Sequence, residues 1–366
     1  MKLKSVIIGL LFLLPAGVAY ADGHGGKSGT QKIERSIAAI PTVAVSLCVD
    51  SGDVTVRGWD KNEVFARSSE VGRLELKRSD TWTQSGGAAK VVVWLADKDE
   101  GQNEKSGCHA FGDVELMVPR GASLYLQTGE GTIDVGDVAS IFARSETGDI
   151  SIHKASRSVE AISFSGEISV ENSSGRMAMK SVSGVINAAN LRANDQNDCF
   201  EASTISGDIQ LDKVGHQLVT VKTANGNIGV SGPLAQQGRY NFNTTSSDVT
   251  LSLPANASFR LNARVARDRE ITSDFPLTLT IEDPVHFIDK KTAPPAPPEP
   301  TPQPAPDPKD RVVVVVDPEV KMVKVKPVIV KNLYSLRRIN AVHGSGDALI
   351  TIASFSGTIY LKNSGN

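Results

Sequence analysis

The chain contains little of what most nucleic-acid-binding and carbohydrate-binding proteins use. Aromatic residues make up 5% of its 366 residues, and its formal net charge is −2 although it has 39 lysines and arginines. No concentrated cationic surface is visible that would release counterions from phosphates, which argues against nucleic-acid binding. Carbohydrate-binding grooves usually display several exposed rings, so the low aromatic content also disfavours a lectin.

Catalytic motifs are missing as well. The sequence has no Ser/His/Asp order, GxSxG or HExxH motif, and its six histidines are scattered. A polysaccharide lyase or hydrolase would need clustered carboxylates, usually with a Lys or Arg. Lys154 and Lys213 each follow a repeat glycine by six residues, but Asn172 and Asn190 take that position in two intervening repeats. Polar turn residues are the simpler interpretation, so we predict no enzyme and no cofactor.

Cysteine is scarce, with only Cys48, Cys108 and Cys199. No CxxC or Cys/His spacing indicates zinc. In an oxidising compartment two of the three can pair, and we favour Cys48 with Cys108 because both lie in the N-terminal part. The alternative is three buried thiols, and Cys199 in NDCFEAS is a candidate core residue.

No apolar run reaches the roughly twenty residues that a transmembrane helix needs. Residues 1–21 instead resemble a secretory signal peptide, with Lys2 and Lys4 before an apolar run and a small-residue site that ends at Ala21. We therefore expect cleavage near Ala21, a flexible leader over 22–41, and a mature chain that is periplasmic, secreted or on the cell surface.

What the sequence has in abundance is one short repeat. It consists of Ser or Thr, Gly, an acidic or polar residue, and two aliphatic residues separated by a polar one, as in SGDVTV (51–56), TGDISI (147–152), SGEISV (165–170) and SGTIYL (356–361). The glycines at 131, 148, 166, 184, 207 and 226 lie 17 to 23 residues apart. A period near twenty is typical of a stacked array in which each repeat buries its apolar side against its neighbours.

The repeat predicts an all-β fold, namely a right-handed β-solenoid or β-helix-like stack of short strands. Two or three strands per turn, about 4.8 Å apart, would align interior pairs from Ile133/Val135 to Val249/Leu251. An N-terminal β region over 42–120 would cap the repeats of 121–284. Glycines would form the corners, through a positive φ or a close approach between coils: Gly52, Gly131, Gly148, Gly166, Gly184, Gly207, Gly226 and Gly357.

A proline-rich tract, TAPPAPPEPTPQPAPDP (292–308), interrupts the pattern and predicts an extended spacer. We interpret 285–335 as a proline-rich linker and basic strand that leave the solenoid, and 336–366 as its final strands. The alternative is a separate C-terminal module. The basic residues after the tract are candidates for contact with an anionic envelope surface, or else protect an edge strand: Lys321, Lys324, Lys326, Lys331, Arg337 and Arg338.

Acidic or amide residues follow most corner glycines, at Asp149, Glu167, Asp208, Asn227 and Asp248, with Val185 interrupting the series. A ladder of carboxylates could bind calcium. The same residues are selected by Asx-type turns, and the glycine- and aspartate-rich nonapeptide of calcium-binding repeats is missing. We therefore favour the turn interpretation and predict no metal site.

Three stretches carry a family resemblance: SGDVTVRGWDKNEV (51–64), DVELMVPRGASLYLQTGEGTIDV (113–135) and DVTLSLPANASFRLNARV (248–265). With the serial SGDI units they resemble the bacterial putative-adhesin family, an extracytoplasmic β-solenoid domain of unknown function (number 4097). The resemblance covers roughly 45–290 and 344–361. It implies a β-solenoid in an envelope setting and supplies no catalytic residue.

We therefore expect a non-enzymatic, adhesin-like binding or scaffold protein of the bacterial cell envelope, whose partner is an unidentified envelope component or protein. Two other functions stay open. One is an envelope-stress sensor or regulator that acts through a protein partner, and the other is a polysaccharide-processing β-helix enzyme.

Overall fold

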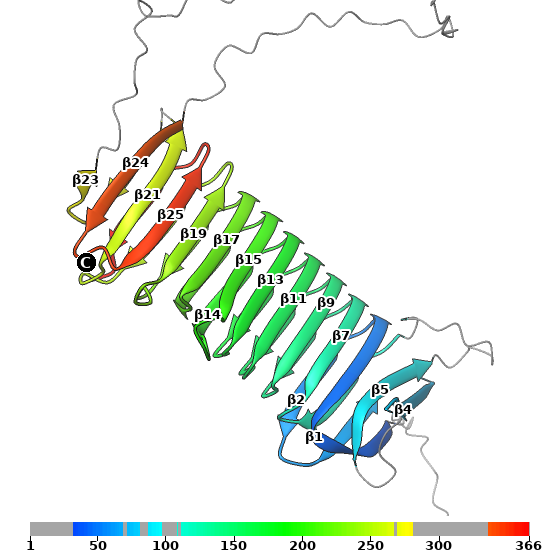
Figure 1. The fold of residues 1–366 in the computed structure, drawn as a ribbon. Helices are drawn as coiled ribbons and strands as arrows, with labels where there is room; N and C mark the ends of the chain where they lie inside the picture. The colour runs from blue at the N-terminus through cyan, green and yellow to red at the C-terminus, as the bar shows by residue number, and fades with distance from the viewer. Residues whose placement is uncertain are drawn as a thin grey trace, which may run out of the picture. The chain divides into compact units, whose positions relative to one another are not determined.

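The repeats form pairs of strands that stack side by side into a long, parallel array (Figure 1). The computed structural model describes residues 32–68, 72–80, 87–96, 108, 111–266, 269–280 and 336–365. Residues from Lys32 onward form one compact unit. The expected signal peptide, the first part of the leader and the whole of 285–335 lie outside the described residues.

Two sheets face each other across the interior. In spatial order, sheet B consists of β4 (Arg73–Arg78), β5 (Ala88–Ala96), β1 (Ile33–Ser51), β7 (Ser123–Glu130), β9 (Ser140–Thr147), β11 (Ser158–Ser165), β13 (Arg176–Ser183), β15 (Cys199–Ser206), β17 (Leu218–Asn225), β19 (Arg239–Thr244), β25 (Ala348–Ser354), β21 (Phe259–Ala266), β24 (Leu336–His343) and β23 (Thr278–Thr280). Sheet A begins with the first part of β1 and continues with β3 (Glu63–Ser68), β6 (Val114–Pro119), β2 (Val54–Trp59), β8 (Ile133–Gly136), β10 (Ile150–His153), β12 (Ile168–Glu171), β14 (Ile186–Arg192), β16 (Ile209–Gly215), β18 (Ile228–Ser231), β20 (Val249–Leu253), β26 (Ile359–Asn363) and β22 (Ile271–Ser273).

Each coil of the stack consists of one strand of sheet B followed by one strand of sheet A. Neighbouring coils pair parallel and in register, so that Ile141 of β9 lies beside Val159 of β11, and Ile150 of β10 lies beside Ile168 of β12. The described residues are all-β, and the predicted solenoid-like stack is confirmed, with two strands in each coil. None of them forms a helix that is long and apolar enough to cross a membrane.

The core lies between the two sheets and follows the period-2 alternation of the strands. The interior pairs that the repeat predicts are buried, except that Val230 is only partly buried. Each fully buried aliphatic side chain contributes about 1.5–3 kcal/mol. Because every coil buries its apolar residues against the coils on either side, stability is shared along the stack.

The predicted leader ends earlier than the sequence suggested. Strand β1 begins at Ile33, and its residues 33–38 pair antiparallel with β3. Ile33 and Ile37 pack against the core and Ala39 is buried, whereas the charged residues between them face solvent. The expectation that all of 22–41 is a flexible leader is therefore wrong for the described part, because the alternating IERSIAAI segment buries one side.

Antiparallel strands flank both sheets at the N-terminal end of the stack and sheet B at the other end. At the N-terminal end β3 pairs antiparallel with β6, and β4 with β5. At the other end β24 lies antiparallel to β21, and β23 lies antiparallel to β24. Short antiparallel strands of this kind limit the exposed edge that a parallel stack would otherwise offer to further strands.

The last strands of the chain do not form the last coil of the stack. Strand β25 pairs with both β19 and β21, and β26 pairs with both β20 and β22, so the coil over 348–363 lies between two coils that precede it in sequence (Figure 1). Ile350, Ile352, Ile359 and Leu361 of this inserted coil are buried. The chain end therefore completes the core.

Candidate functional site

The corner glycines serve the stack, because each lies where the backbones of two coils come into contact. A Cβ atom on Gly184 would lie 2.0 Å from the carbonyl oxygen of Gly166, and one on Gly207 would lie 2.1 Å from that of Gly184. Gly148 and Gly166 also have positive φ values of 141° and 149°. All eight predicted glycines make such contacts with a neighbouring coil, so their role at the corners is to let the coils approach closely.

A column of buried hydroxyls, which sequence reasoning missed, runs beside the glycines. Thr204 Oγ1 donates to the Gly184 carbonyl at 3.3 Å, and Thr223 Oγ1 donates to that of Gly207 at 3.2 Å. The column consists of Thr128, Ser145, Ser163, Ser181, Thr204, Thr223, Thr244 and Ser354, all buried. The signal was present in the sequence, because each residue stands three positions before the corner residue of its repeat.

The acidic column links coil to coil. Asp149 Oδ1 accepts the backbone N–H of Glu167 at 2.7 Å, and Asp208 Oδ1 accepts that of Asn227 at 2.7 Å. Asp248 caps Thr358 of the inserted coil in the same way. No group of three or more His, Cys, Asp or Glu side chains in the described residues could hold a metal ion. The side chains therefore act as caps, although for the next coil rather than for their own turn.

In four successive coils, the position six residues after the corner glycine holds either lysine or asparagine. Lys154, Asn172, Asn190 and Lys213 have φ values of 56°, 51°, 53° and 52°. This left-handed region is one that Asn tolerates better than Lys. All four residues share this backbone conformation, which fits the interpretation of the position as a turn.

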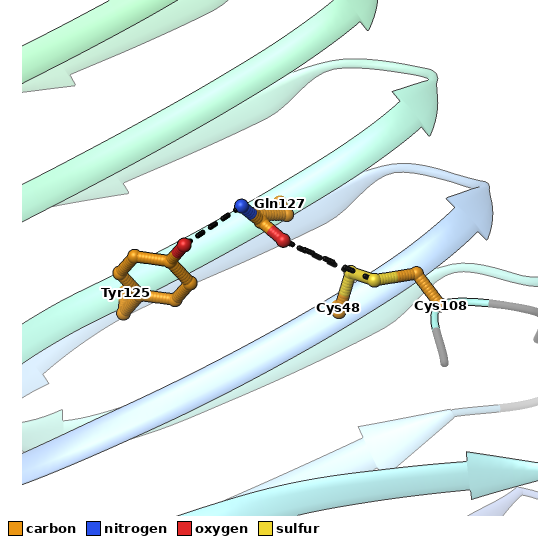
Figure 2. Close-up of a disulfide and its surroundings, with 4 residues drawn as sticks. All are labelled: Cys48, Cys108, Tyr125 and Gln127. Carbon is orange, nitrogen blue, oxygen red and sulfur yellow. Dashed lines mark hydrogen bonds between the residues drawn. A yellow bond between two sulfur atoms is a disulfide. The ribbon is translucent and has the colours of Figure 1, made fainter. Parts of the chain in front are cut away.

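Cys48 and Cys108 are joined by a disulfide, with their Cα atoms 4.9 Å apart (Figure 2). Gln127 lies over it, with Oε1 3.5 Å from Cys48 Sγ and Nε2 donating to the Tyr125 hydroxyl at 2.8 Å. A disulfide sulfur has no proton to donate, so the first contact is one of packing. Cys199 is not a core residue: it is free and partly exposed, because β15 directs Phe200 inward and Cys199 outward.

The predicted basic contact residues lie largely beyond the described part of the chain. Lys321, Lys324, Lys326 and Lys331 fall outside the described residues, and Arg337 and Arg338 lie on β24. Arg338 is exposed and pairs in register with Arg264 of β21. Two arginine positions therefore lie side by side at this end of sheet B.

On the outward side of sheet B the chemistry of the side chains changes from coil to coil. Along β9 the outward residues are Ser140, Phe142, Arg144 and Glu146, and the parallel register extends each of these positions into a column that crosses all the coils. The column of Glu146 becomes apolar in the next coils. Phe164 is 61% exposed and Ile205 is 56% exposed, with Val182 between them.

A groove of about 470 Å³ opens on this side, over β7 to β15. It forms where the outward residues are small, namely Ser140, Ser158 and Ala178, between larger neighbours. Phe142 lines one part of it, and its ring stacks on that of Tyr125 with centroids 4.7 Å apart and planes 6° apart.

Four charged side chains surround Ala178 in this groove: Glu160, Glu201, Arg176 and Lys180. Glu160 and Glu201 lie beside Ala178 on the two neighbouring strands, and Arg176 and Lys180 lie two residues away on β13 itself. All four are exposed and none takes part in a salt bridge within the described chain. The groove thus combines rings, hydroxyls and charges of both signs.

Solved structures of two other proteins show weak likenesses to this chain. A putative cell adhesion protein from Clostridium sporogenes is 9% identical over 91% of this chain and all of its own solved chain, with a TM-score of 0.25. A putative adhesin from Parabacteroides distasonis is 11% identical over 61% of this chain and 90% of its own, with a TM-score of 0.36. At these values the likenesses carry no argument about ligand or activity.

No curated protein matches the sequence. The model of one family, described as Toastrack DUF4097, matches residues 44–275, well over half of the chain. It is the family that the serial SGDI units resemble. The chain therefore belongs to the Toastrack DUF4097 family.

Proposed function

We propose that the chain is a non-enzymatic, adhesin-like binding or scaffold protein of the bacterial cell envelope, and that the outward side of sheet B is its binding surface. The observation that carries the proposal is that some polar residues hold neighbouring coils together, whereas others on the outward side of sheet B do not. The glycine and acidic columns and most of the buried hydroxyls are occupied in contacts between coils. The outward columns of sheet B instead hold charged side chains such as Glu160, Arg176 and Lys180, which form no salt bridge within the described chain, next to the stacked rings of Tyr125 and Phe142.

A stack of this kind is well suited to binding. Parallel coils hold their outward side chains about 4.8 Å apart on strands that are fixed by hydrogen bonds on both sides. Little conformational entropy is then lost when a partner binds. The exposed apolar column with Phe164 and Ile205 further supports contact with a partner, because contiguous exposed apolar side chains often mark an interaction surface.

Co-sedimentation tests the proposal. The purified mature protein is mixed with peptidoglycan sacculi or membrane vesicles across a salt series, and the pelleted fraction is measured. We expect pelleting with at least one of them. If the protein pellets with neither, direct envelope binding is wrong and a soluble protein partner, as in the regulator hypothesis, becomes the better explanation.

The basic segment can be tested in the same assay. A deletion that reached residue 338 would remove part of β24, which pairs with β21. Replacement of Lys321, Lys324, Lys326 and Lys331 by Gln keeps that strand. If these lysines contact an anionic surface, the variant should lose the salt-sensitive part of the pelleting, since each exposed lysine contributes up to about 1 kcal/mol.

The non-enzymatic part of the proposal has its own test. An acidic polysaccharide incubated with the protein should show no new reducing ends. Cleavage that disappears in the Glu160→Gln, Glu201→Gln double variant would contradict it and favour the enzyme hypothesis.

A further inference from the structure

We infer that the groove over β7 to β15 binds an oligosaccharide whose rings carry carboxylates. The inference rests on the proposed function and names the ligand class for its binding surface. It is argued from the shape of the groove, its rings and its unpaired polar groups.

The shape suits an extended ligand. Five neighbouring strands contribute to the groove, and four strand-to-strand steps span about 19 Å. Ser140 and Ser158 are neighbours in one outward column and Ala178 lies in the next column, so the low floor crosses the strands obliquely. A chain of sugar rings laid across the coils would meet outward side chains of one strand after another, about 4.8 Å apart.

The rings offer a stacking surface. Phe142 lines the groove and is backed by Tyr125, which lies almost parallel to it and is 47% exposed. The C–H side of a pyranose packs on such a flat apolar surface, and its hydroxyls point to the sides. The chain has few aromatic residues, but the register brings two of them together at one end of this groove.

The polar groups fit the edges of a sugar. The hydroxyls of Ser140 and Ser158 and the carboxylate of Glu160 have no hydrogen-bond partner within the described residues. The hydroxyls donate and accept, and the carboxylate accepts from sugar hydroxyls. Hydroxyl-rich rings would satisfy all three groups.

The two basic side chains of the groove give it a preference for sugars that carry a carboxylate. Arg176 and Lys180 lie about 7 Å from Ala178 in opposite directions along the strand. An arginine fork binds a carboxylate in a bidentate manner, and a lysine adds a point charge. Glu160 and Glu201 offset these charges, so we expect a preference for acidic over neutral sugars of about fivefold rather than a strong dependence on charge.

The test uses the full mature protein and four defined probes. These are tetramers of galacturonate and of mannuronate, together with their carboxyl-reduced counterparts, and binding is measured by saturation-transfer NMR with titration. We expect at least one acidic tetramer to bind with a Kd below about 1 mM. Its reduced counterpart should bind about fivefold more weakly.

Three variants separate the contributions. Phe142→Ala should weaken acidic and reduced tetramers alike, by about tenfold. The Arg176→Gln, Lys180→Gln double variant should remove the preference for the acidic form. Ala178→Trp fills the groove from an outward position and should abolish binding. Lys222→Gln is the matched control, because Lys222 lies in the column of Lys180 but outside the groove.

Several outcomes would overturn the inference. These are no binding of either acidic tetramer, unchanged binding in Ala178→Trp with an intact far-UV CD spectrum, and equal displacement by tetraglutamate, which would indicate a peptide ligand. The proposed function is judged separately. A protein that pellets with envelope fractions but binds no tetramer keeps its function and loses this ligand.

Discussion

Substitution of one corner glycine tests whether close approach between coils, rather than chain flexibility, explains the repeat. In Gly184→Ala the new Cβ would lie 2.0 Å from the Gly166 oxygen, whereas real Cβ contacts stay above 3.0 Å, so the coils must separate there by about 1 Å. The bond from Ile168 N–H to the Val185 carbonyl, 3.0 Å long, lies beside this contact. Overpacking together with one or two weakened hydrogen bonds gives an expected loss of about 2–4 kcal/mol.

Urea unfolding of wild type, Gly184→Ala and Gly215→Ala provides the measurement. At Gly215 a Cβ would meet its nearest neighbour at 3.4 Å, an ordinary contact. That variant should be neutral or stabilised by about 0.4–1 kcal/mol, because alanine restricts the unfolded chain. Hydrogen exchange in peptides over 165–190 should also rise only in Gly184→Ala. Equal stability of the two variants would refute the close-approach explanation.

Three further predictions concern single side chains. Lys154→Asn should stabilise the protein by up to about 1 kcal/mol, because Lys154 has a φ of 56°. Thr204→Val removes a buried donor and should cost about 1 kcal/mol, whereas Ser145→Ala should be nearly neutral because that buried hydroxyl has no partner. Burial lowers the pKa of His216, partly opposed by its hydrogen bond to a backbone carbonyl and by Asp198, so unfolding should become easier as the pH falls below about 6.5, where the unfolded chain takes up the proton first.

Matched variants keep these predictions specific. Lys222 lies on strand β17, where no residue has a positive φ, so Lys222→Asn should not stabilise the protein. A gain in stability in this variant would contradict the backbone explanation for Lys154. His216→Gln should flatten the decline in urea midpoint between pH 7.5 and 5.5. The same decline in both proteins would assign the pH dependence to other groups.

The fold was predictable because its repeat follows from backbone geometry. A corner that is glycine in nearly every repeat, with Ser247 as an exception, and a strand with alternating burial recur along the stack and leave a pattern in the sequence. The position of the last coil was not predictable. The unit SGTIYL fits any gap in the stack, and only the pairing of β26 with β20 and β22 shows which one it fills.

The candidate site was harder to foresee, for a different reason. Phe142, Glu160 and Ala178 are neighbours only through the register, and the next step to Glu201 spans 23 residues because the chain between β14 and β15 is longer. These outward residues share no motif, since the stack does not constrain them. Cys199 was misjudged because it lies next to the apolar residue Phe200. Successive side chains of a strand point to opposite faces, so the burial of Phe200 places Cys199 on the outward side.

Cys199 itself offers the most direct test of the claim that the outward side of sheet B binds the envelope. Cys199 is free and partly exposed on β15. Because Met177 pairs with Phe200, Cys199 lies beside Arg176 on the outward side of sheet B. A 5-kDa maleimide-polyethylene glycol on Cys199 should abolish co-sedimentation with the envelope fraction that the unlabelled protein binds. The same label on the Cys199→Ser, Ser169→Cys variant, on the outward side of sheet A, should not. Binding that survives the label on Cys199 but is lost with the label on sheet A would contradict the account.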